Sequence, residues 1–119
     1  MSTSRGRVLL VDDERPILAA TRDLLQDYGY EVEVHSDAAG IPERLRDVRP
    51  DVLLQDVRMP GLDVRELLGI LRADPALRDT RVVLFSASLE AQELGQELSV
   101  PVLRKPFKPQ ALLAALRGE

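Results

Sequence analysis

The stretch that most constrains the fold of this chain is residues 50–66, PDVLLQDVRMPGLDVRE. Its apolar run, residues 52–54, is short and continuous, which is typical of a strand covered on both faces of a sheet. The strand leads into a carboxylate, Asp56, and Pro60 and Gly61 then end it in a turn. Open α/β sheets bind ligands at the carboxyl ends of their strands. The pattern therefore places Asp56 where such a sheet carries its chemistry.

A helix start follows this turn. Asp63 and Glu66 match the D-x-x-E pattern, in which the Asp63 side chain accepts hydrogen bonds from backbone N–H groups and Glu66 reaches back. We expect the helix to run from about Val64 to Ala73, because Asp74 and Pro75 follow. The side chains expected to face the sheet are Leu67, Ile70 and Leu71.

Three further apolar runs also end on polar groups. Residues 7–11 lead into Asp12 and Asp13, residues 81–85 into Ser86, and residues 100–103 into Arg104, Lys105 and Pro106. The position shared by these groups, rather than any one residue, indicates that they meet at one edge of a sheet. Residues 31–34 instead alternate polar and apolar side chains, which predicts a half-exposed edge strand.

Helical patterns separate the strands. The predicted helices run from Glu14 to before Gly29, from near Gly40–Pro42 to before Pro50, over residues 64–73, over residues 89–98, and from Pro109 onward. The expected inward side chains of the first are Ile17, Ala20, Leu24 and Tyr28, with Leu25 beside them; those of the second are Leu45 and Val48, and those of the last are Leu112, Leu113 and Leu116. Strands that alternate with helices predict an α/β fold with a parallel sheet and helices on both faces.

Composition narrows the class of protein. A chain of 119 residues with 45% apolar and 30% charged residues is expected to form one domain, residues 1–119. The net charge of −4 argues against direct nucleic-acid binding. The absence of cysteine excludes disulfides and thiolate metal sites. No apolar run is long enough for a membrane span, and the first residues, MSTSRGR, lack a signal-peptide pattern, so a cytoplasmic location is expected.

Three carboxylates at two strand ends, Asp12, Asp13 and Asp56, would repel one another without a cation. Mg²⁺ is the expected cation, because it takes oxygen ligands from one or two carboxylates, water and phosphate. A carboxylate is also a nucleophile that forms an aspartyl phosphate without a general base. The Lys105 ammonium and the Ser86 hydroxyl could each bond a phosphoryl oxygen. These residues together predict a site that makes and holds a phosphoaspartate.

In this order and spacing, the motifs VDDE, LLQDVRMPGLD, the Ser-Ala after the fourth strand and RKPF resemble the receiver domain of two-component response regulators. The resemblance covers almost the whole chain. It implies a flavodoxin-like (βα)₅ fold with strand order 2-1-3-4-5. It also implies a phosphoacceptor switch, which takes its phosphoryl group from a histidine kinase or a histidine phosphotransfer protein. Such a domain catalyses its own phosphorylation and dephosphorylation but is not otherwise an enzyme.

The resemblance also assigns roles to individual residues. Asp56 corresponds to the phosphoacceptor, Asp13 to the direct ligand of Mg²⁺ (or Mn²⁺), Asp12 to its partner through water, the Arg58 carbonyl to the backbone metal ligand, Ser86 to the switch hydroxyl, Ala87 to the small residue that leaves room for the phosphoryl group, and Lys105 to the phosphate-binding lysine. The Lys105–Pro106 bond is expected to be cis. Arg58 and Ser88 flank the site at positions that tune phosphoryl lifetime in the family.

The chain departs from the family pattern in several places, among them the following three. Val102 stands where the fifth strand usually has an aromatic or histidine residue, the segment from Ser86 to Lys105 is a few residues short, and Gln55 is polar where an aliphatic residue is common. These departures concern signal transmission more than phosphorylation. They motivate an alternative, a pseudo-receiver that binds a partner without using phosphate. The downstream partner and the oligomeric state stay open.

A third hypothesis is a phosphatase that forms an aspartyl-phosphate intermediate. Haloacid-dehalogenase-like enzymes of this kind place D-x-D after the first strand, whereas this chain has Asp12, Asp13 and Glu14 there. Nucleotide-binding folds are disfavoured, because neither G-x-G-x-x-G after a strand nor G-x-x-x-x-G-K-[ST] occurs.

Overall fold

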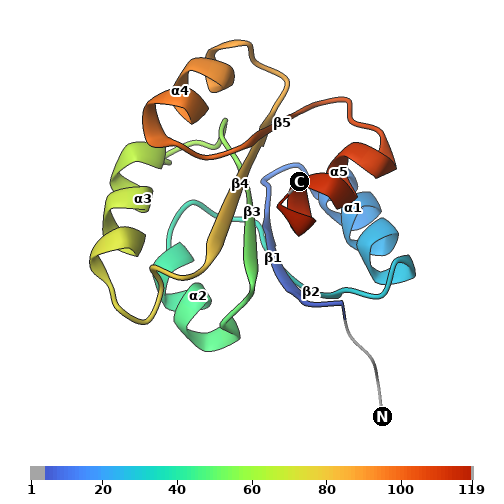
Figure 1. Cartoon of the computed structure of the whole chain (residues 1–119), viewed down its shortest axis with the longest axis horizontal. Helices are drawn as coiled ribbons and strands as arrows, with labels where there is room; N and C mark the ends of the chain where they lie inside the picture. The colour runs from blue at the N-terminus through green and yellow to red at the C-terminus, as the bar shows by residue number, and fades with distance from the viewer. Residues whose placement is uncertain (1–4, 119) are drawn as a thin grey trace.

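The computed structural model describes residues 5–118, and within them five strands alternate with five helices. The elements are β1 (Arg7–Val11), α1 (Arg15–Asp27), β2 (Glu31–His35), α2 (Ile41–Val48), β3 (Val52–Asp56), α3 (Val64–Ala73), β4 (Arg81–Ser86), α4 (Glu90–Leu98), β5 (Val102–Arg104) and α5 (Pro109–Arg117) (Figure 1). All strand pairs are parallel, in the order β2-β1-β3-β4-β5. This confirms the predicted flavodoxin-like fold. The predicted domain ends, residues 1–4 and 119, lie outside the described residues.

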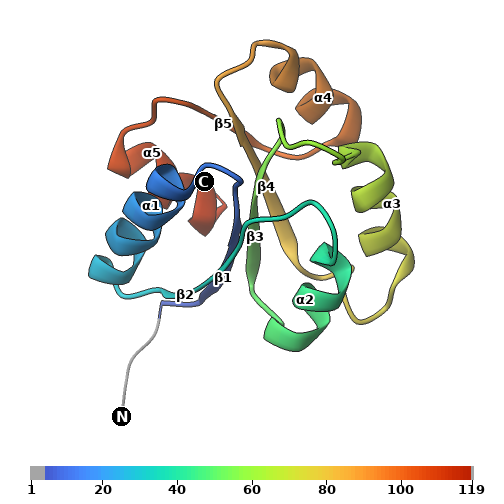
Figure 2. The same ribbon diagram turned by 180° about the vertical axis from the view of Figure 1, so that it is seen from behind.

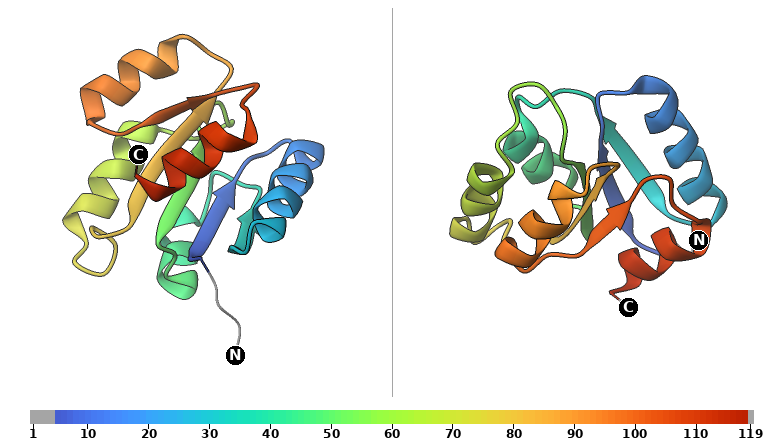
Figure 3. Two further views of the ribbon diagram at one scale, coloured as in Figure 1. Left: turned by 45° about the vertical axis from the view of Figure 1, so that its right-hand side comes forward. Right: turned by 90° about the horizontal axis from the view of Figure 1, so that it is seen from above.

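The helices form a layer on each face of the sheet. Helices α1 and α5 lie on one side, and α2, α3 and α4 lie on the other (Figures 2 and 3). Alternate strand residues feed the two layers: Val8, Leu10 and Leu54 pack in the cluster that contains Leu25 and Leu112, and Leu9 and Leu53 pack in the cluster that contains Ile41, Leu45 and Leu67. The alternation follows from the two-residue period of a strand. It explains why the central strands are continuously apolar.

The central and edge strands differ as the sequence predicts. All five residues of β3 are buried, whereas in β2 Glu31 and Glu33 are exposed and Val32 and Val34 are half-buried. Strand β2 pairs only with β1, so it forms one edge of the sheet, and β5 forms the other. The residues at the buried end of β3 are therefore held on both sides by neighbouring strands.

The helix starts also follow the sequence. Pro42 lies in the first turn of α2, as predicted, and Gly40 adopts a φ of 78° just before it. The Asp63 side chain accepts a hydrogen bond from the Glu66 N–H at 3.1 Å, and this caps α3. The reciprocal bond from Glu66 to the Asp63 N–H is absent among the side-chain hydrogen bonds of residues 5–118, so half of the predicted capping box forms.

Two predicted helix faces are wrong in part. Helix α1 buries Leu18, Thr21 and Leu25, whereas Ile17 and Leu24 are half-buried and Ala20 and Tyr28 are exposed. Helix α3 buries Leu68, which is 1% exposed, and leaves Ile70 39% exposed. The buried residues are spaced i, i+3, i+7 in α1 and i, i+3, i+4, i+7 in α3, so one face of each helix still lies inward. The helix rotates about its axis relative to the prediction, because the sheet surface selects which side chains fit.

The segment between Ser86 and Lys105 is compact. Helix α4 spans nine residues and β5 spans three. Gly95 of α4 is buried, and a Cβ at this position would overlap Val102 Cγ2 and approach the Val100 carbonyl to 2.9 Å. The predicted short fourth helix is thus present, and it packs closely on β5. None of the helices in residues 5–118 has the length and apolar character needed to cross a membrane.

Candidate functional site

The polar groups predicted to meet do lie together, at the carboxyl ends of β1, β3, β4 and β5. Lys105 Nζ lies 3.1 Å from Asp12 Oδ2 and 3.8 Å from Asp56 Oδ1. Asp12 is fully buried, Asp56 is 3% exposed and Ser86 is 1% exposed. Lys105 Nζ also lies 4.3 Å from the centre of the Phe85 ring, a cation–π contact that helps to hold it over β4. The single ammonium of Lys105 therefore forms ion pairs with two buried carboxylates.

Four carboxylates gather beside this lysine. Oxygen atoms of Asp12, Asp13, Glu14 and Asp56 all lie within 4.8 Å of one another. Three of the four were predicted from the sequence, and Glu14 was assigned only to the helix start. Its position directly after Asp12 and Asp13 is the sequence signal that could have identified it. In the structure the Glu14 N–H donates to Asp12 Oδ1 at 2.9 Å, which keeps Glu14 beside the cluster. The donor set is entirely hard oxygen, which fits a divalent cation such as Mg²⁺.

The electrostatics of Asp56 follow from its position. Burial raises the pKa of Asp56 from 3.8 to about 6, while the Lys105 charge and the Arg58 N–H lower that pKa and the neighbouring Asp12 raises it. Burial has the largest effect because water no longer solvates the ionised form. A bound cation would favour the ionised carboxylate.

The loop after β3 is fastened to the Asp56 side chain. The Arg58 N–H donates to Asp56 Oδ1 at 3.3 Å, which brings the Arg58 backbone beside the carboxylate, where its carbonyl was predicted to bind metal. The Arg58 side chain is exposed. Next to it, Gln55 is fully buried, and its Nε2 donates to the Asp56 carbonyl at 2.9 Å. Sequence reasoning identified Gln55 as unusual but did not predict this contact.

The hydroxyl of Ser86 connects the site to α4. Ser86 Oγ accepts a hydrogen bond from the Ser88 N–H at 3.0 Å, and Ser88 Oγ accepts one from the Glu90 N–H at 3.2 Å. The Ser86 carbonyl accepts from the Lys105 N–H at 3.0 Å. The predicted small residue, Ala87, is exposed just beyond Ser86, and the Lys105–Pro106 bond is cis as predicted.

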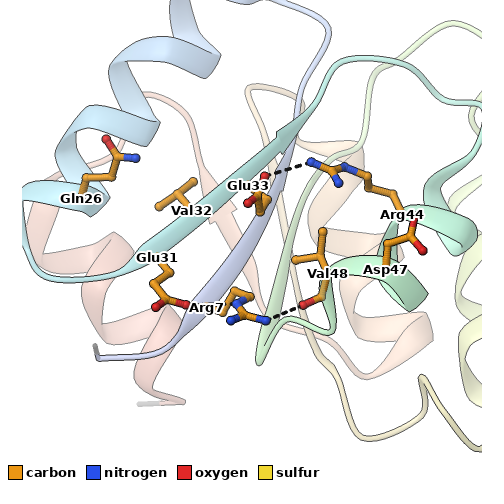
Figure 4. Close-up of a pocket in the computed structure, with 8 residues that line it drawn as sticks. All are labelled: Arg7, Gln26, Glu31, Val32, Glu33, Arg44, Asp47 and Val48. Atoms are coloured by element: carbon orange, nitrogen blue, oxygen red, sulfur yellow. Dashed lines mark hydrogen bonds and ion pairs between the residues drawn. The ribbon is translucent and has the colours of Figure 1, made fainter. Parts of the chain in front are cut away.

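Two surface hollows differ in their position relative to the carboxylate cluster. One hollow of about 430 Å³ between α3 and α4 is lined by Arg58 and Ser88, the two flanking positions. Another of about 530 Å³ lies against β2 and α2 and contains none of the predicted site residues (Figure 4). Its side chains bond to one another: Arg44 binds Glu33 at 3.0 Å, and Arg7 donates to the Val48 carbonyl at 2.8 Å. The chemistry thus lies at the strand ends rather than in this hollow.

Comparison with known proteins agrees with this geometry. The family model for the response regulator receiver domain matches residues 8–117. The chemotaxis response regulator CheY4 of Vibrio cholerae has a similar structure, with a TM-score of 0.82 and 31% identity over 98% of both chains. A response regulator structure from Chloroflexus aurantiacus has a TM-score of 0.85 at 26% identity over 95% of both chains. This chain belongs to the response regulator receiver domain family.

The curated relatives are longer proteins. The DNA-binding response regulator MtrA of Mycobacterium tuberculosis is 31% identical over 121 residues, which cover 99% of this chain and 52% of MtrA. The response regulator protein FleR of Pseudomonas aeruginosa is 36% identical over 110 residues, which cover 91% of this chain and 23% of FleR. The chain therefore spans about half the length of MtrA and about a quarter of that of FleR.

Proposed function

We propose that this domain is a phosphorylation switch in which Asp56 is the phosphoacceptor. The observation that carries the proposal is the position of Asp56 at a buried strand end, between the Lys105 ammonium at 3.8 Å and the three other carboxylates. A buried carboxylate beside one cation and a divalent-cation site is suited to attack phosphorus, because charge neutralisation is most of what phosphoryl transfer requires. Membership of the receiver family supports the same function.

The transfer is a displacement at phosphorus. An Asp56 carboxylate oxygen forms the new P–O bond, the P–N bond of a phosphohistidine donor breaks, and the released imidazole nitrogen takes a proton from water. Lys105 lies close enough to Asp56 to bond a phosphoryl oxygen, and Ser86 Oγ can donate its proton to another while it still accepts from the Ser88 N–H. Water later hydrolyses the acyl phosphate, which returns inorganic phosphate and free Asp56.

The carboxylates would hold Mg²⁺ or Mn²⁺. We assign Asp13, Asp56 and the Arg58 carbonyl as ligands, with Asp12 acting through water, and Glu14 is close enough to join Asp13. The cation would neutralise charge on the phosphoryl oxygens. The grouping of four carboxylates around one lysine leaves an excess of negative charge, and this supports the assignment.

The domain is proposed to act on itself rather than on an external substrate. The chain lacks the D-x-D pattern of phosphatases with an aspartyl-phosphate intermediate. The proposed donor is a histidine kinase or a histidine phosphotransfer protein, and the proposed location is the cytoplasm. No observation on residues 5–118 favours the pseudo-receiver alternative, and the grouping of Lys105 with the buried Asp12 and Asp56 supports the phosphorylation switch.

The output is proposed to pass through α4. A phosphoryl dianion at Asp56 would attract the proton of the Ser86 hydroxyl, and this hydroxyl is linked through Ser88 to the first turn of α4. A shift at this hydroxyl would bias the position of the helix. The downstream partner is a further protein that reads this face.

Intact-mass measurement after acetyl phosphate treatment tests the proposal. The wild type should gain one phosphoryl group with Mg²⁺ and none with a chelator, whereas Asp56→Asn should gain none in either case. An unmodified wild type in the presence of Mg²⁺ would contradict the proposed function. A modified Asp56→Asn would show that another residue is the acceptor.

A further inference from the structure

Gln55 is a buried polar side chain that breaks the apolar pattern of β3. It is fully buried, and its Oε1 is the one buried side-chain nitrogen or oxygen in residues 5–118 that has no hydrogen-bond partner. Burying an amide oxygen without a partner costs free energy that an aliphatic side chain would not cost. A buried group of this kind calls for a physical explanation, and departures from local rules concentrate at functional sites.

The other end of the same amide is fully used. Gln55 Nε2 donates to the Asp56 carbonyl at 2.9 Å and contacts Met59 Sδ at 3.5 Å. Rotating the amide by 180° would place Oε1 against the Asp56 carbonyl oxygen, and two acceptors would repel each other. The orientation with Oε1 unpartnered is therefore the one the surroundings require.

The two contacts span the segment on which the site depends. Residues 56–59 contain the Asp56 carboxylate and the Arg58 carbonyl, which are separated by one residue. The Gln55 amide holds the first carbonyl of this segment and touches its last side chain, while the Arg58 N–H binds Asp56 Oδ1 at 3.3 Å. The side chain of Gln55 and the backbone of Arg58 thus fix this short loop from both faces.

We propose that Gln55 is a positioning residue, which orients the Asp56–Met59 loop so that the Asp56 carboxylate and the Arg58 carbonyl can bind one divalent cation together. The inference rests on the proposed function, because it concerns the same site. Gln55 does not touch the cation; it acts through the peptide group between Asp56 and Val57. A leucine or methionine at position 55 would fill the same space without a donor. The loop would then lose the bond to the Asp56 carbonyl and keep those of the Val57 N–H to the Phe85 carbonyl and of the Arg58 N–H to Asp56 Oδ1.

Mg²⁺ binding to the unphosphorylated protein is the direct test, measured by isothermal titration calorimetry with Mg²⁺ alone. Gln55→Leu and Gln55→Met should each weaken Mg²⁺ binding by about tenfold, which is typical when the support of a metal ligand is removed. Using both variants separates loss of the donor from the shape of either replacement. The rate of phosphorylation by acetyl phosphate should fall at low Mg²⁺ and recover at saturating Mg²⁺, because the nucleophile itself is unchanged.

Leu53→Met is the matched control, since Leu53 is fully buried on the same strand and the same face, two residues away. Its Mg²⁺ affinity should equal that of the wild type. Equal Mg²⁺ affinity in the wild type and both Gln55 variants would overturn the inference, and so would an equal loss in Leu53→Met, because core packing would then be the cause. A wild type that neither binds Mg²⁺ nor becomes phosphorylated would instead overturn the proposed function, and this inference with it.

Discussion

The centre of the sheet and its β4–β5 side are built differently. At the centre, β3 has five buried residues and pairs with a strand on each side. At the β5 edge, three residues pair with β4 alone, and α4 covers them by close contact through Gly95. The residues proposed for phosphorylation lie at the carboxyl ends of strands from both regions, with Asp56 on β3, Ser86 on β4 and Lys105 after β5. The β5 edge, however, lacks the usual aromatic side chain, because it has Val102. The proposed site therefore draws on both regions, whereas the departure at Val102 concerns the edge alone.

At this edge, side chains of α3 bind α4. The Arg65 guanidinium donates to both carboxylate oxygens of Glu97, with Nη2 2.9 Å from Oε1. Arg72 donates to the Leu98 carbonyl at the end of α4. Gly95 has no Cβ, and this allows α4 to approach Val102 closely. In this receiver, α4 is held by a neighbouring helix and by backbone proximity rather than by an aromatic ring beneath it.

The largest expected effect tests the proposed site at the strand ends. Lys105→Met keeps the length of the stem and removes the charge, so the rate of phosphorylation by acetyl phosphate should fall about 100-fold, as when one donor to a developing charge is removed. Lys108→Met is the matched control, because Lys108 is the other lysine of the chain and is exposed. Equal rates for the wild type and Lys105→Met would show that phosphorylation at Asp56 does not depend on this ammonium.

A pH series of the metal-free protein sharpens the same side of the comparison. The pKa of Asp56 is about 6 in the folded state and 3.8 for an unburied aspartate, so the folded state binds the proton more tightly than the unfolded state does. The stabilisation that comes from proton binding at Asp56 is therefore fully present below pH 4, and it is lost as the pH rises through 6. The shift corresponds to at most about 3 kcal/mol.

The comparison variant for this series is Asp56→Asn, which cannot ionise. In chelator, its free energy of unfolding should exceed that of the wild type by an amount that grows between pH 4 and pH 7. Urea unfolding at several pH values measures this difference. A difference that is constant with pH would contradict the raised pKa. Added Mg²⁺ should reduce the difference, because it stabilises the ionised wild-type carboxylate.

The β5 edge is tested by a methyl group. Gly95→Ala should lower the free energy of unfolding by about 1–3 kcal/mol, because the new Cβ would overlap Val102 and crowd the Val100 carbonyl. Gly69→Ala in α3 is the matched control, since no atom lies within 4 Å of its added Cβ. That control should raise the stability by about 0.5–1 kcal/mol. If both variants behave alike, the close packing of α4 on β5 is not a constraint.

The smallest expected effect concerns the link from α3 to α4. Arg65→Gln removes the exposed ion pair with Glu97. In the wild type, the hydrogen bond from Arg65 lowers the pKa of Glu97. Global stability should change little, because exposed ion pairs contribute little. Amide hydrogen exchange in α4 should nevertheless become faster. Arg22→Gln, which removes an exposed pair with Asp23 within α1, should leave exchange in α4 unchanged.

Much of the site could be predicted because its residues follow strands with clear apolar runs. Asp12 and Ser86 come directly after such a run, and Asp56 and Lys105 come one residue later. Parallel strands place these ends at one edge. Glu14 was missed as a member of the carboxylate cluster because its place at a helix start explained it already. The role of Gln55 was missed because its partner, the Asp56 carbonyl, is a backbone group that no sequence pattern marks.

The sequence alone determined the order of the elements, the ends of the strands and the carboxylates they carry, because apolar runs, prolines and glycines act locally. Only the tertiary structure decided which side of each helix is buried. Leu18 and Leu68 lie inward where the pattern favoured Ile17 and Ile70, since a helix with apolar residues on adjacent faces turns to fit the sheet beneath it. The tertiary structure also decided the approach of Gly95 to Val102 and left Gln55 Oε1 without a partner. Both depend on how side chains and backbone groups pack in space, which no local sequence pattern records.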